Sequence, residues 1–267
     1  EWQRPRFPAH ERPAVGDWVL LEDAASKRPR IVALLPRHTG IKRGAAGEHY
    51  HQQVIAANID TVFIVCGLDA DFNPRRIERY LLLVGGGGAQ PVVVLINPNN
   101  PTGATYPREL LERIVAIAAK HRLLLMVDEI YDQVLYDGAR FEPVAPLAGD
   151  HPCITFSGLS KVHRACGWRV GWGVVSGHGD VVRDFLHAMD LLSALRLCAN
   201  VPGQHAIQVA LGGYQSIEAL VSPGGRLYEQ RNVTWEKLNE IPGVSCVEPR
   251  GALYCFPRLD PEVYRLD

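Results

Sequence analysis

The stretch 91–103 reads PVVVLINPNNPTG and separates two parts of the chain that differ in character. Its first half is a run of β-branched apolar residues, which is typical of a buried strand. Its second half contains two Asn-Pro pairs and ends in Thr-Gly, a composition that favours turns. The question is which protein this strand belongs to, because the residues on its two sides indicate different ones.

The part before this strand begins with a β-rich region. Residues 1–57 contain the apolar runs VGDWVLLED (15–23) and RIVALLP (30–36), which Gly and Pro punctuate, and they predict a small β-barrel. Basic side chains gather in its loops. Two interpretations of them stay open, contact with RNA phosphates and an ordinary solvated surface. These residues are Lys27, Arg28, Arg37, Lys42 and Arg43.

From about residue 58 the pattern changes to strand, helix, strand. TVFIVCG (61–67) is an apolar strand, and NPRRIERYLLLV (73–84) predicts a helix with Asn73 as N-cap and Pro74 at the first helical position. The run GGGGAQ (85–90) ends this helix. One such unit predicts parallel pairing of its two strands.

The part after residue 103 continues as alternating helices and strands. A helix is expected over 106–121, where apolar residues share one face, and strands over 122–132, 153–158 and 168–177. Further helices are expected over 179–195, 203–211 and 224–239, with a closing hairpin at 243–259. The fold class is therefore α/β, with a mostly parallel sheet in three layers after the small barrel.

The composition excludes several classes of protein. The 267 residues carry 28 basic and 29 acidic side chains, so net charge gives no general case for nucleic acid or membrane binding. No apolar run approaches the ~20 residues of a membrane span, and no signal peptide opens the chain. Six scattered cysteines without a CxxC pair indicate neither a zinc site nor a disulfide framework, so we expect reduced thiols, no metal and a cytoplasmic protein.

Polar residues follow the predicted strands of the second part. In open α/β sheets, ligands bind beyond the carboxyl ends of the strands. Pyridoxal 5'-phosphate needs a lysine for a Schiff base, an acid beside its pyridine nitrogen and an anion site for its phosphate. Each residue alone is weak evidence, but their joint order is specific. The candidates are Asn100, Asp128, Tyr131, Ser157, Ser160, Lys161 and Arg169.

Longer stretches around these residues resemble the pyridoxal-phosphate aminotransferases of fold type I. They include LINPNNPTGATYPRELLERIVAIAAKH, TFSGLSKVHRACGWRVGW and GALYCFPRLDPEVY. The resemblance covers 95–267 and is greatest to the bacterial branch that exchanges amino groups between alanine and 2-oxoglutarate. It implies amino acid and 2-oxo acid substrates, a homodimer, and a large-domain portion at 95–220 followed by the start of a small domain at 221–267.

The same resemblance implies a role for each candidate. Lys161 is the Schiff-base lysine and moves protons, Asp128 pairs with the pyridine nitrogen, and Tyr131 and Asn100 contact the ring oxygen. Arg169 binds the phosphate. Ser157 and Ser160 are also expected near the cofactor, although Gly158 stands where many relatives carry a serine.

Residues 14–94 resemble a different family, the circularly permuted GTPase that assists maturation of the small ribosomal subunit. The resemblance lies in VGDWVLLED, in AAGEHYHQQVIAANIDTVFIVCGLDADFNPRRIERYLLLV and in GAQPVVVL. It implies an OB-like barrel at 1–57 and the βαβ start of a GTPase domain at 58–94. No phosphate loop of the form GxxxxGK[ST] occurs in the 267 residues, so we expect no GTPase activity.

The strand PVVVL suits both families, and the chain changes from one to the other near residues 92–97. We therefore expect a chimera whose aminotransferase part is incomplete at both ends, with weak cofactor binding and negligible turnover. Two alternatives stay open: an RNA- or ribosome-binding module in residues 1–57 with an inert passenger, and a chimera without any activity.

Overall fold

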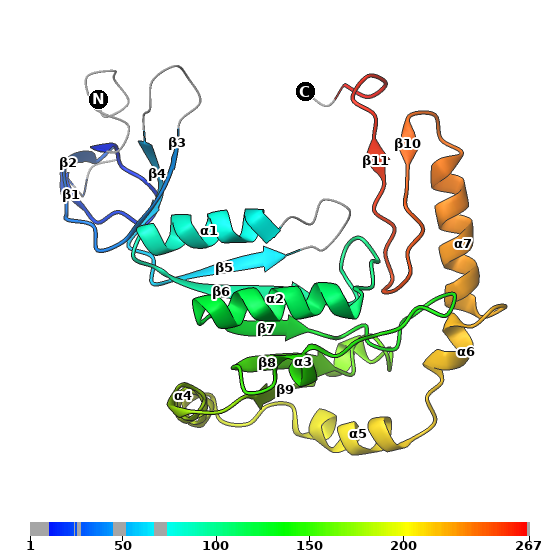
Figure 1. The fold of residues 1–267 in the computed structure, drawn as a ribbon. Helices are drawn as coiled ribbons and strands as arrows, with labels where there is room; N and C mark the ends of the chain where they lie inside the picture. The colour runs from blue at the N-terminus through cyan, green and yellow to red at the C-terminus, as the bar shows by residue number, and fades with distance from the viewer. Residues whose placement is uncertain (1–10, 24, 26–27, 45–51, 67–73, 266–267) are drawn as a thin grey trace. The chain divides into compact units, whose positions relative to one another are not determined.

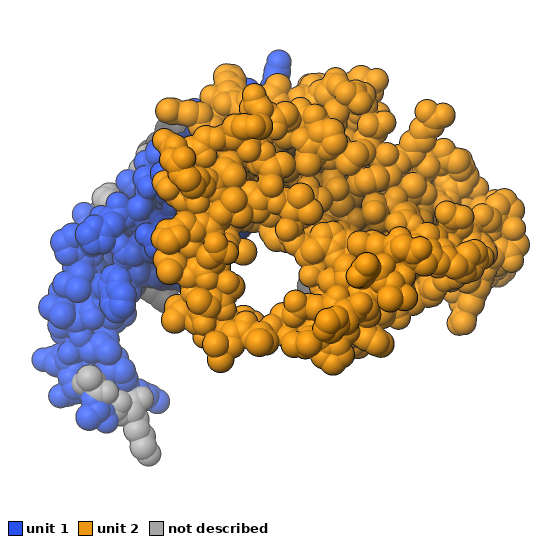
Figure 2. All heavy atoms as spheres, turned by 90° about the horizontal axis from the view of Figure 1, so that it is seen from below, with its two compact units in different colours: residues 1–64, 73–92 blue, residues 65–72, 93–267 orange. Residues whose placement is uncertain are grey.

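The computed structural model describes residues 11–23, 25, 28–44, 52–66 and 74–265. The chain divides into two compact units, the first formed by 1–64 and 73–92 and the second by 65–72 and 93–267 (Figure 2). The division after residue 92 falls inside strand β6 (Gln90–Ile96), between Val92 and Val93. This place lies within the interval 92–97, where the sequence changes from one resemblance to the other.

The first unit contains two antiparallel ladders. Strand β1 (Val19–Glu22) pairs with β2 (Arg30–Leu34), and β3 (Gly40–Gly44) pairs with β4 (Gln52–Ala57). Each ladder has one shift of register, which bends a strand pair locally. The described residues thus form two separate two-stranded sheets here, and closure into a barrel stays a prediction.

Strand β5 (Thr61–Cys66) and helix α1 (Pro74–Gly86) follow, as the sequence predicts. The helix begins at Pro74, whose fixed φ suits the first turn, while Asn73 lies outside the described residues. It runs two glycines further than expected. Gly87 then approaches β3 so closely that a Cβ there would lie 2.6 Å from the carbonyl oxygen of Gly40. Only glycine fits such a contact.

The second unit is built on a sheet with strand order β6-β7-β8-β9, where β7 is Leu124–Asp128, β8 is Cys153–Gly158 and β9 is Gly171–Ser176 (Figure 1). Strands β7 and β8 are parallel, and β9 is antiparallel to β8. Helix α2 (Arg108–His121) packs against β7, and the short helix α3 (Val144–Ala148), which the sequence did not predict, packs against α2 and β8. The predicted α/β class with a mostly parallel sheet is confirmed.

Two exposed helices follow the sheet. They are α4 (Asp180–Arg196) and α5 (Val201–Gly212), close to the predicted ranges, and α4 packs against β9. Apolar side chains along both helices are exposed: Leu186, Met189, Leu191, Leu192, Leu195, Val201, Val209 and Leu211. A buried amphipathic helix would hide such residues, so a wide apolar surface of this chain stays in contact with solvent.

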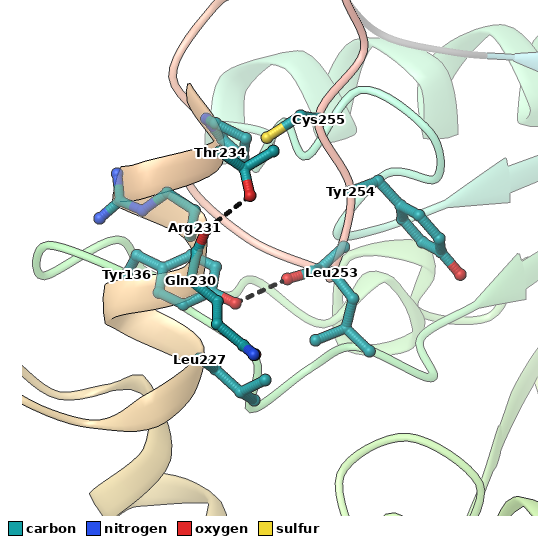
Figure 3. Close-up of a pocket in the computed structure, with 10 residues that line it drawn as sticks. Tyr136, Leu227, Gln230, Arg231, Thr234, Leu253, Tyr254 and Cys255 are labelled. Carbon is teal, nitrogen blue, oxygen red and sulfur yellow. Dashed lines mark hydrogen bonds between the residues drawn. The ribbon is translucent and has the colours of Figure 1, made fainter. Parts of the chain in front are cut away.

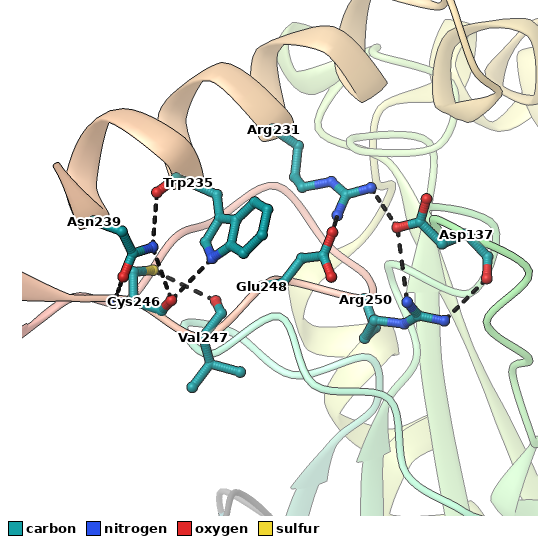
Figure 4. A network of polar contacts seen from close by, with 8 residues as sticks. All are labelled: Asp137, Arg231, Trp235, Asn239, Cys246, Val247, Glu248 and Arg250. Atoms are coloured by element: carbon teal, nitrogen blue, oxygen red, sulfur yellow. Dashed lines mark hydrogen bonds and ion pairs between the residues drawn. The ribbon is translucent and has the colours of Figure 1, made fainter.

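The last elements are α6 (Ile217–Val221), α7 (Arg226–Asn239) and a hairpin of β10 (Val244–Ser245) with β11 (Arg258–Leu259). The hairpin was expected over 243–259, whereas α6 was not predicted. Arg231 of α7 is buried and pairs with Asp137 and with Glu248, which lies 2.5 Å away (Figure 4). These pairs tie α7 to residues that are distant in sequence.

None of the helices in the described part of the chain combines the length and the apolar character that a membrane span requires.

Candidate functional site

The carboxyl end of β7 supplies an acid. Asp128 is the last residue of this strand, and its Oδ1 accepts a 3.1 Å hydrogen bond from the amide of Ile130. Burial raises the pKa of Asp128 above its ordinary value, while this hydrogen bond and the charge of Lys161 act in the opposite direction. Asp128 and Lys161 therefore interact electrostatically.

Lys161 lies in a loop of residues 159–170 that joins β8 to β9. Two backbone bonds close this loop, from Leu159 N to Val170 O at 3.2 Å and from Ala165 N to Leu159 O at 3.0 Å. The Nζ atom of Lys161 lies 5.8 Å from the centre of the Tyr131 ring. Asp128 and Tyr131 come from one predicted segment and Lys161 from another, and the fold brings the three residues together.

Ser160 and Arg169 are held within the same loop. The Cys166 thiol donates to the carbonyl of Ser160 at 2.9 Å, and Nη1 of Arg169 donates to the carbonyl of Cys166 at 2.8 Å. The sequence places Arg169 inside an apolar strand, and this is wrong. Arg169 has φ +51° and follows a 3-10 turn (Cys166–Trp168), because β9 begins only at Gly171. A left-handed residue cannot continue an extended strand.

Arg169 nevertheless lies near the edge of the sheet expected for it. Strand β9 runs antiparallel to β8 and pairs Gly171 with Gly158, so the start of β9 lies beside the end of β8. The sequence predicts Arg169 near the start of a strand over 168–177, where a parallel strand would have placed it at the opposite end of the sheet from Lys161. Antiparallel pairing brings it to the same edge from the other direction.

The roles of all seven candidates stay predictions, including those of the remaining two, Ser157 and Asn100. Ser157 lies within β8, opposite Trp172 of β9, and is half-buried. Asn100 is exposed in the turn after β6, whereas Asn99 is buried and its Oδ1 accepts from Thr102 Oγ1 at 2.7 Å. The buried asparagine shapes the turn, and the exposed one has its side chain available.

Sequence reasoning missed Tyr254. Its hydroxyl lies 2.5 Å from the hydroxyl of Tyr131, and the two rings meet edge to face with centroids 5.7 Å apart. Burial, and then the hydrogen bond with Tyr254, raise the pKa of Tyr131 far above its ordinary value. Tyr131 therefore stays a protonated phenol at neutral pH. The sequence signal was the segment GALY (251–254), which the resemblance included without a role.

A pocket of about 240 Å³ lies between α7 and the segment after Pro249 (Figure 3). Tyr136, Arg231 and Tyr254 line it, and Tyr254 is directed away from α7. The hydroxyl of Tyr136 donates to the carbonyl of Ala252 at 3.0 Å. Through Tyr254, the pocket thus lies next to the Tyr131–Tyr254 pair, on the side of α7.

One of the basic residues of the first unit is held in an ion pair within the unit. Arg37 donates to both carboxylate oxygens of Asp17 at 2.6 Å, and this ion pair lowers the pKa of Asp17. Lys42 is exposed, whereas Lys27 lies outside the described residues. Arg37 therefore serves the fold of this unit. Among the described residues, no group of three or more His, Cys, Asp or Glu side chains is placed to hold a metal ion.

The two parts of the chain match two different families of known proteins. Residues 82–266 match the family model of aminotransferase class I and II, and residues 34–122 match that of the RsgA GTPase. The two matches overlap on 82–122, a range that contains β6. The strand that suits both resemblances is therefore matched by both families.

Individual relatives agree with this division. The chain is 60% identical over 175 residues to an alanine aminotransferase of Mycobacterium tuberculosis, covering 66% of this chain and 41% of that protein. It is 75% identical over 116 residues to the small ribosomal subunit biogenesis GTPase RsgA of Xanthomonas euvesicatoria, covering 43% of this chain and 31% of that one. The predicted chimera of these two families is confirmed.

A solved structure supports the fold. An aminotransferase from Escherichia coli superposes with a TM-score of 0.64 at 56% identity, over 66% of this chain and 43% of that chain. The chain thus spans about two fifths of the length of the curated aminotransferases that it matches.

Proposed function

This chain belongs to the aminotransferase class I and II family, and we propose that its second unit binds pyridoxal 5'-phosphate at Lys161. The reaction type is amino-group exchange between alanine and 2-oxoglutarate, and we expect this chain to perform it poorly. The observation that carries the proposal is the grouping of Asp128, Tyr131 and Lys161 at the carboxyl end of the sheet.

The chemistry of these side chains fits the cofactor. When bound, pyridoxal phosphate acts as an electron sink for the carbon that loses its proton. With the cofactor bound, the amine of Lys161 would condense with its aldehyde with loss of water, and after displacement by the substrate amine it would move a proton at the substrate carbon. Asp128 would keep a proton on the ring nitrogen, and Tyr131 would donate to the ring oxygen. Asn100 is a second candidate for that contact.

The anion site of the proposal rests on the loop 159–170. Arg169 offers a planar fork of donors suited to a phosphate, and Ser160 offers a hydroxyl from the same loop, with Ser157 beside it in β8. The loop is closed by its own backbone bonds, so binding the phosphate needs no refolding of this segment.

The match to the relatives covers only part of their length. It spans 41% of the Mycobacterium tuberculosis enzyme, and α4 and α5 expose apolar side chains along their length.

The test is borohydride reduction after incubation with pyridoxal phosphate, followed by peptide mapping. We expect the reduced adduct on Lys161, and its loss in Lys161→Ala. The matched control is Lys120→Ala, which removes a lysine from the end of α2. Diffuse labelling of several lysines that Lys161→Ala leaves unchanged would overturn the proposal.

A second candidate function concerns residues 1–57, and the identity to the RsgA GTPase favours it. In this function the β-rich unit binds RNA of the small ribosomal subunit through exposed basic residues such as Lys42. Salt-sensitive co-sedimentation of the chain with small ribosomal subunits, reduced by Lys42→Glu, supports it. If the chain does not co-sediment with small ribosomal subunits even at low salt, this second function is contradicted.

A further inference from the structure

We propose that Tyr254 is a positioning residue of the candidate site, which donates its hydroxyl proton to Tyr131 and leaves the Tyr131 proton free for the cofactor. The inference rests on the proposed function and assigns a role to a residue that the sequence argument passed over. It acts through Tyr131 and involves no direct contact with the reacting atoms.

The first support is the contact itself. The two hydroxyl oxygens lie 2.5 Å apart, at the short end of the range of O–H···O hydrogen bonds. Each hydroxyl carries one proton and two lone pairs. If Tyr254 donates, Tyr131 accepts and keeps its own proton for another acceptor. The edge-to-face packing of the rings restricts the direction of both C–O bonds.

The second support is how firmly the chain holds Tyr254. Residues 250–252 form antiparallel backbone bonds with 134–136, from Ala252 N to Val134 O at 2.9 Å and from Tyr136 N to Arg250 O at 3.0 Å. Tyr254 follows two residues later. The backbone that carries it is therefore fixed to the segment that begins three residues after Tyr131.

The third support is the environment of Tyr131. Its ring is 2% exposed and shares an apolar cluster with Val134, Val162 and Ala252, against which Tyr254 packs. A phenol in such a place stays protonated and is a poor partner for water. Its hydroxyl direction is then decided by the few polar groups nearby, and Tyr254 is the group that the structure places in hydrogen-bond contact with it.

A double-mutant cycle on the full chain tests the inference. The variants are Tyr254→Phe, Tyr131→Phe and the two combined. Tyr136→Phe is the matched control, since it removes a buried hydroxyl that bonds to the same segment at Ala252 but does not contact the Tyr131 hydroxyl. The first readout needs no cofactor: the ¹³C NMR resonance of the hydroxyl-bearing ring carbon of Tyr131. We expect it to move in Tyr254→Phe and to stay in Tyr136→Phe.

The second readout is the pH midpoint of the visible absorption of the protein loaded with pyridoxal phosphate. Because a hydrogen bond from Tyr131 favours the ionised ring oxygen, we expect Tyr254→Phe to raise this midpoint by roughly 0.5–1 pH unit. Tyr131→Phe should raise it further, and the double variant should match Tyr131→Phe, since one residue acts through the other.

The outcomes separate the two proposals. A midpoint unchanged in Tyr254→Phe, or an additive double variant, overturns the positioning role while the function stands. Failure of the parent chain to take the cofactor at Lys161 overturns the proposed function. In that case the NMR measurement alone tests the hydrogen bond between Tyr254 and Tyr131. A Tyr131 resonance that does not move in Tyr254→Phe overturns the positioning role.

Discussion

The amide of Val144 donates a 2.9 Å hydrogen bond to Oε1 of Glu129, a buried carboxylate beside the candidate site. Burial raises the pKa of Glu129 to about 7, and the nearby Asp132 and Asp128 add to the shift. The folded chain therefore binds a proton here at a pH where the unfolded chain has released it.

The stability of the folded chain should therefore fall as the pH rises. The folded-state pKa of Glu129 is raised, so its contribution to stability is fully present below pH 4.5 and is lost as the pH rises through about 7. Over that window the loss amounts to about 3 kcal/mol. Glu129→Gln keeps an oxygen for Val144 and removes the titration. We expect it to match the parent near pH 5 and to be more stable near pH 8 in urea unfolding.

The control is Glu112→Gln, which removes an exposed carboxylate from α2 and its ion pair with Arg108. It should change stability by at most about 0.5 kcal/mol at either pH. A difference between Glu129→Gln and the parent that does not grow with pH contradicts the prediction.

Gly103, at the end of the NPNNPTG turn, is required by close packing. It has φ +71°, and a Cβ there would lie 2.6 Å from Cβ of Pro249. Its carbonyl also accepts from the amides of Arg250 and Gly251 at 2.9 and 2.8 Å. The turn is thus joined to the segment that leads to Tyr254.

Gly138 provides a matched comparison, because it has φ +70° and open space where a Cβ would lie. Both alanine variants carry the cost of a left-handed residue, about 1–2 kcal/mol. Gly103→Ala should lose about 1–3 kcal/mol more, from the clash alone. Equal losses for the two variants in denaturant unfolding would show that the segment moves aside freely.

Arg231 should dominate the stability of the last part of the chain. Its side chain is 4% exposed and pairs with Asp137 and Glu248, and it lies 4.9 Å from the centre of the Tyr136 ring. Burial acts to raise the pKa of Asp137, but the hydrogen bonds and charge of Arg231 outweigh it and the pKa is lowered. Replacing Arg231 removes the cation that pairs with the carboxylates of Asp137 and Glu248.

We expect Arg231→Met to cost about 1–3 kcal/mol, since it removes hydrogen bonds to two carboxylates that are partly exposed, and Arg250 still pairs with Asp137. Arg226→Met, at the start of the same helix, is the control for loss of an arginine. Limited proteolysis should cut the variant after α6 sooner than the parent. A parent-like cleavage pattern would mean that the apolar contacts of α7 suffice.

The sequence predicted local structure better than long-range contact. Strand β8 has the predicted bounds of 153–158, because its apolar run is bordered by turns on both sides. Helix α6 was missed since five residues cannot show a helical period. Arg169 was misplaced because a 3-10 turn interrupts what reads as one apolar strand.

The candidate site follows the same division. The proximity of Asp128, Tyr131 and Lys161 could be predicted because Asp128 ends β7, Tyr131 follows it and Lys161 follows β8, and the carboxyl ends of parallel strands lie at the same end of a sheet. Tyr254 could not, because its partner lies 123 positions away and the contact depends on how residues 250–252 pair with 134–136. The burial of Glu129 could not be predicted either, because an acidic residue next to another, here Asp128, is normally expected to lie in contact with solvent.

The exposed apolar face of α4 should drive self-association of this chain. Leu192 and Leu195 are 63% and 82% exposed, and Leu191 and Met189 extend the surface. Exposed apolar areas of this kind mark interfaces or aggregation sites. We expect Leu192→Lys/Leu195→Lys to elute later in size-exclusion chromatography at the same protein concentration. Because both side chains are exposed, unfolding free energy should change by at most about 0.5 kcal/mol.

The matched control is Ser193→Lys/Ala194→Lys, which adds the same two charges to neighbouring exposed positions but removes little apolar area. If this control shifts the elution as much as the leucine variant does, charge repulsion explains the effect and the apolar face is not its cause. If only the leucine variant elutes as a smaller species, the apolar face of α4 holds the copies together. The assays of Lys161 should then use the leucine variant, since association would otherwise mask weak cofactor binding.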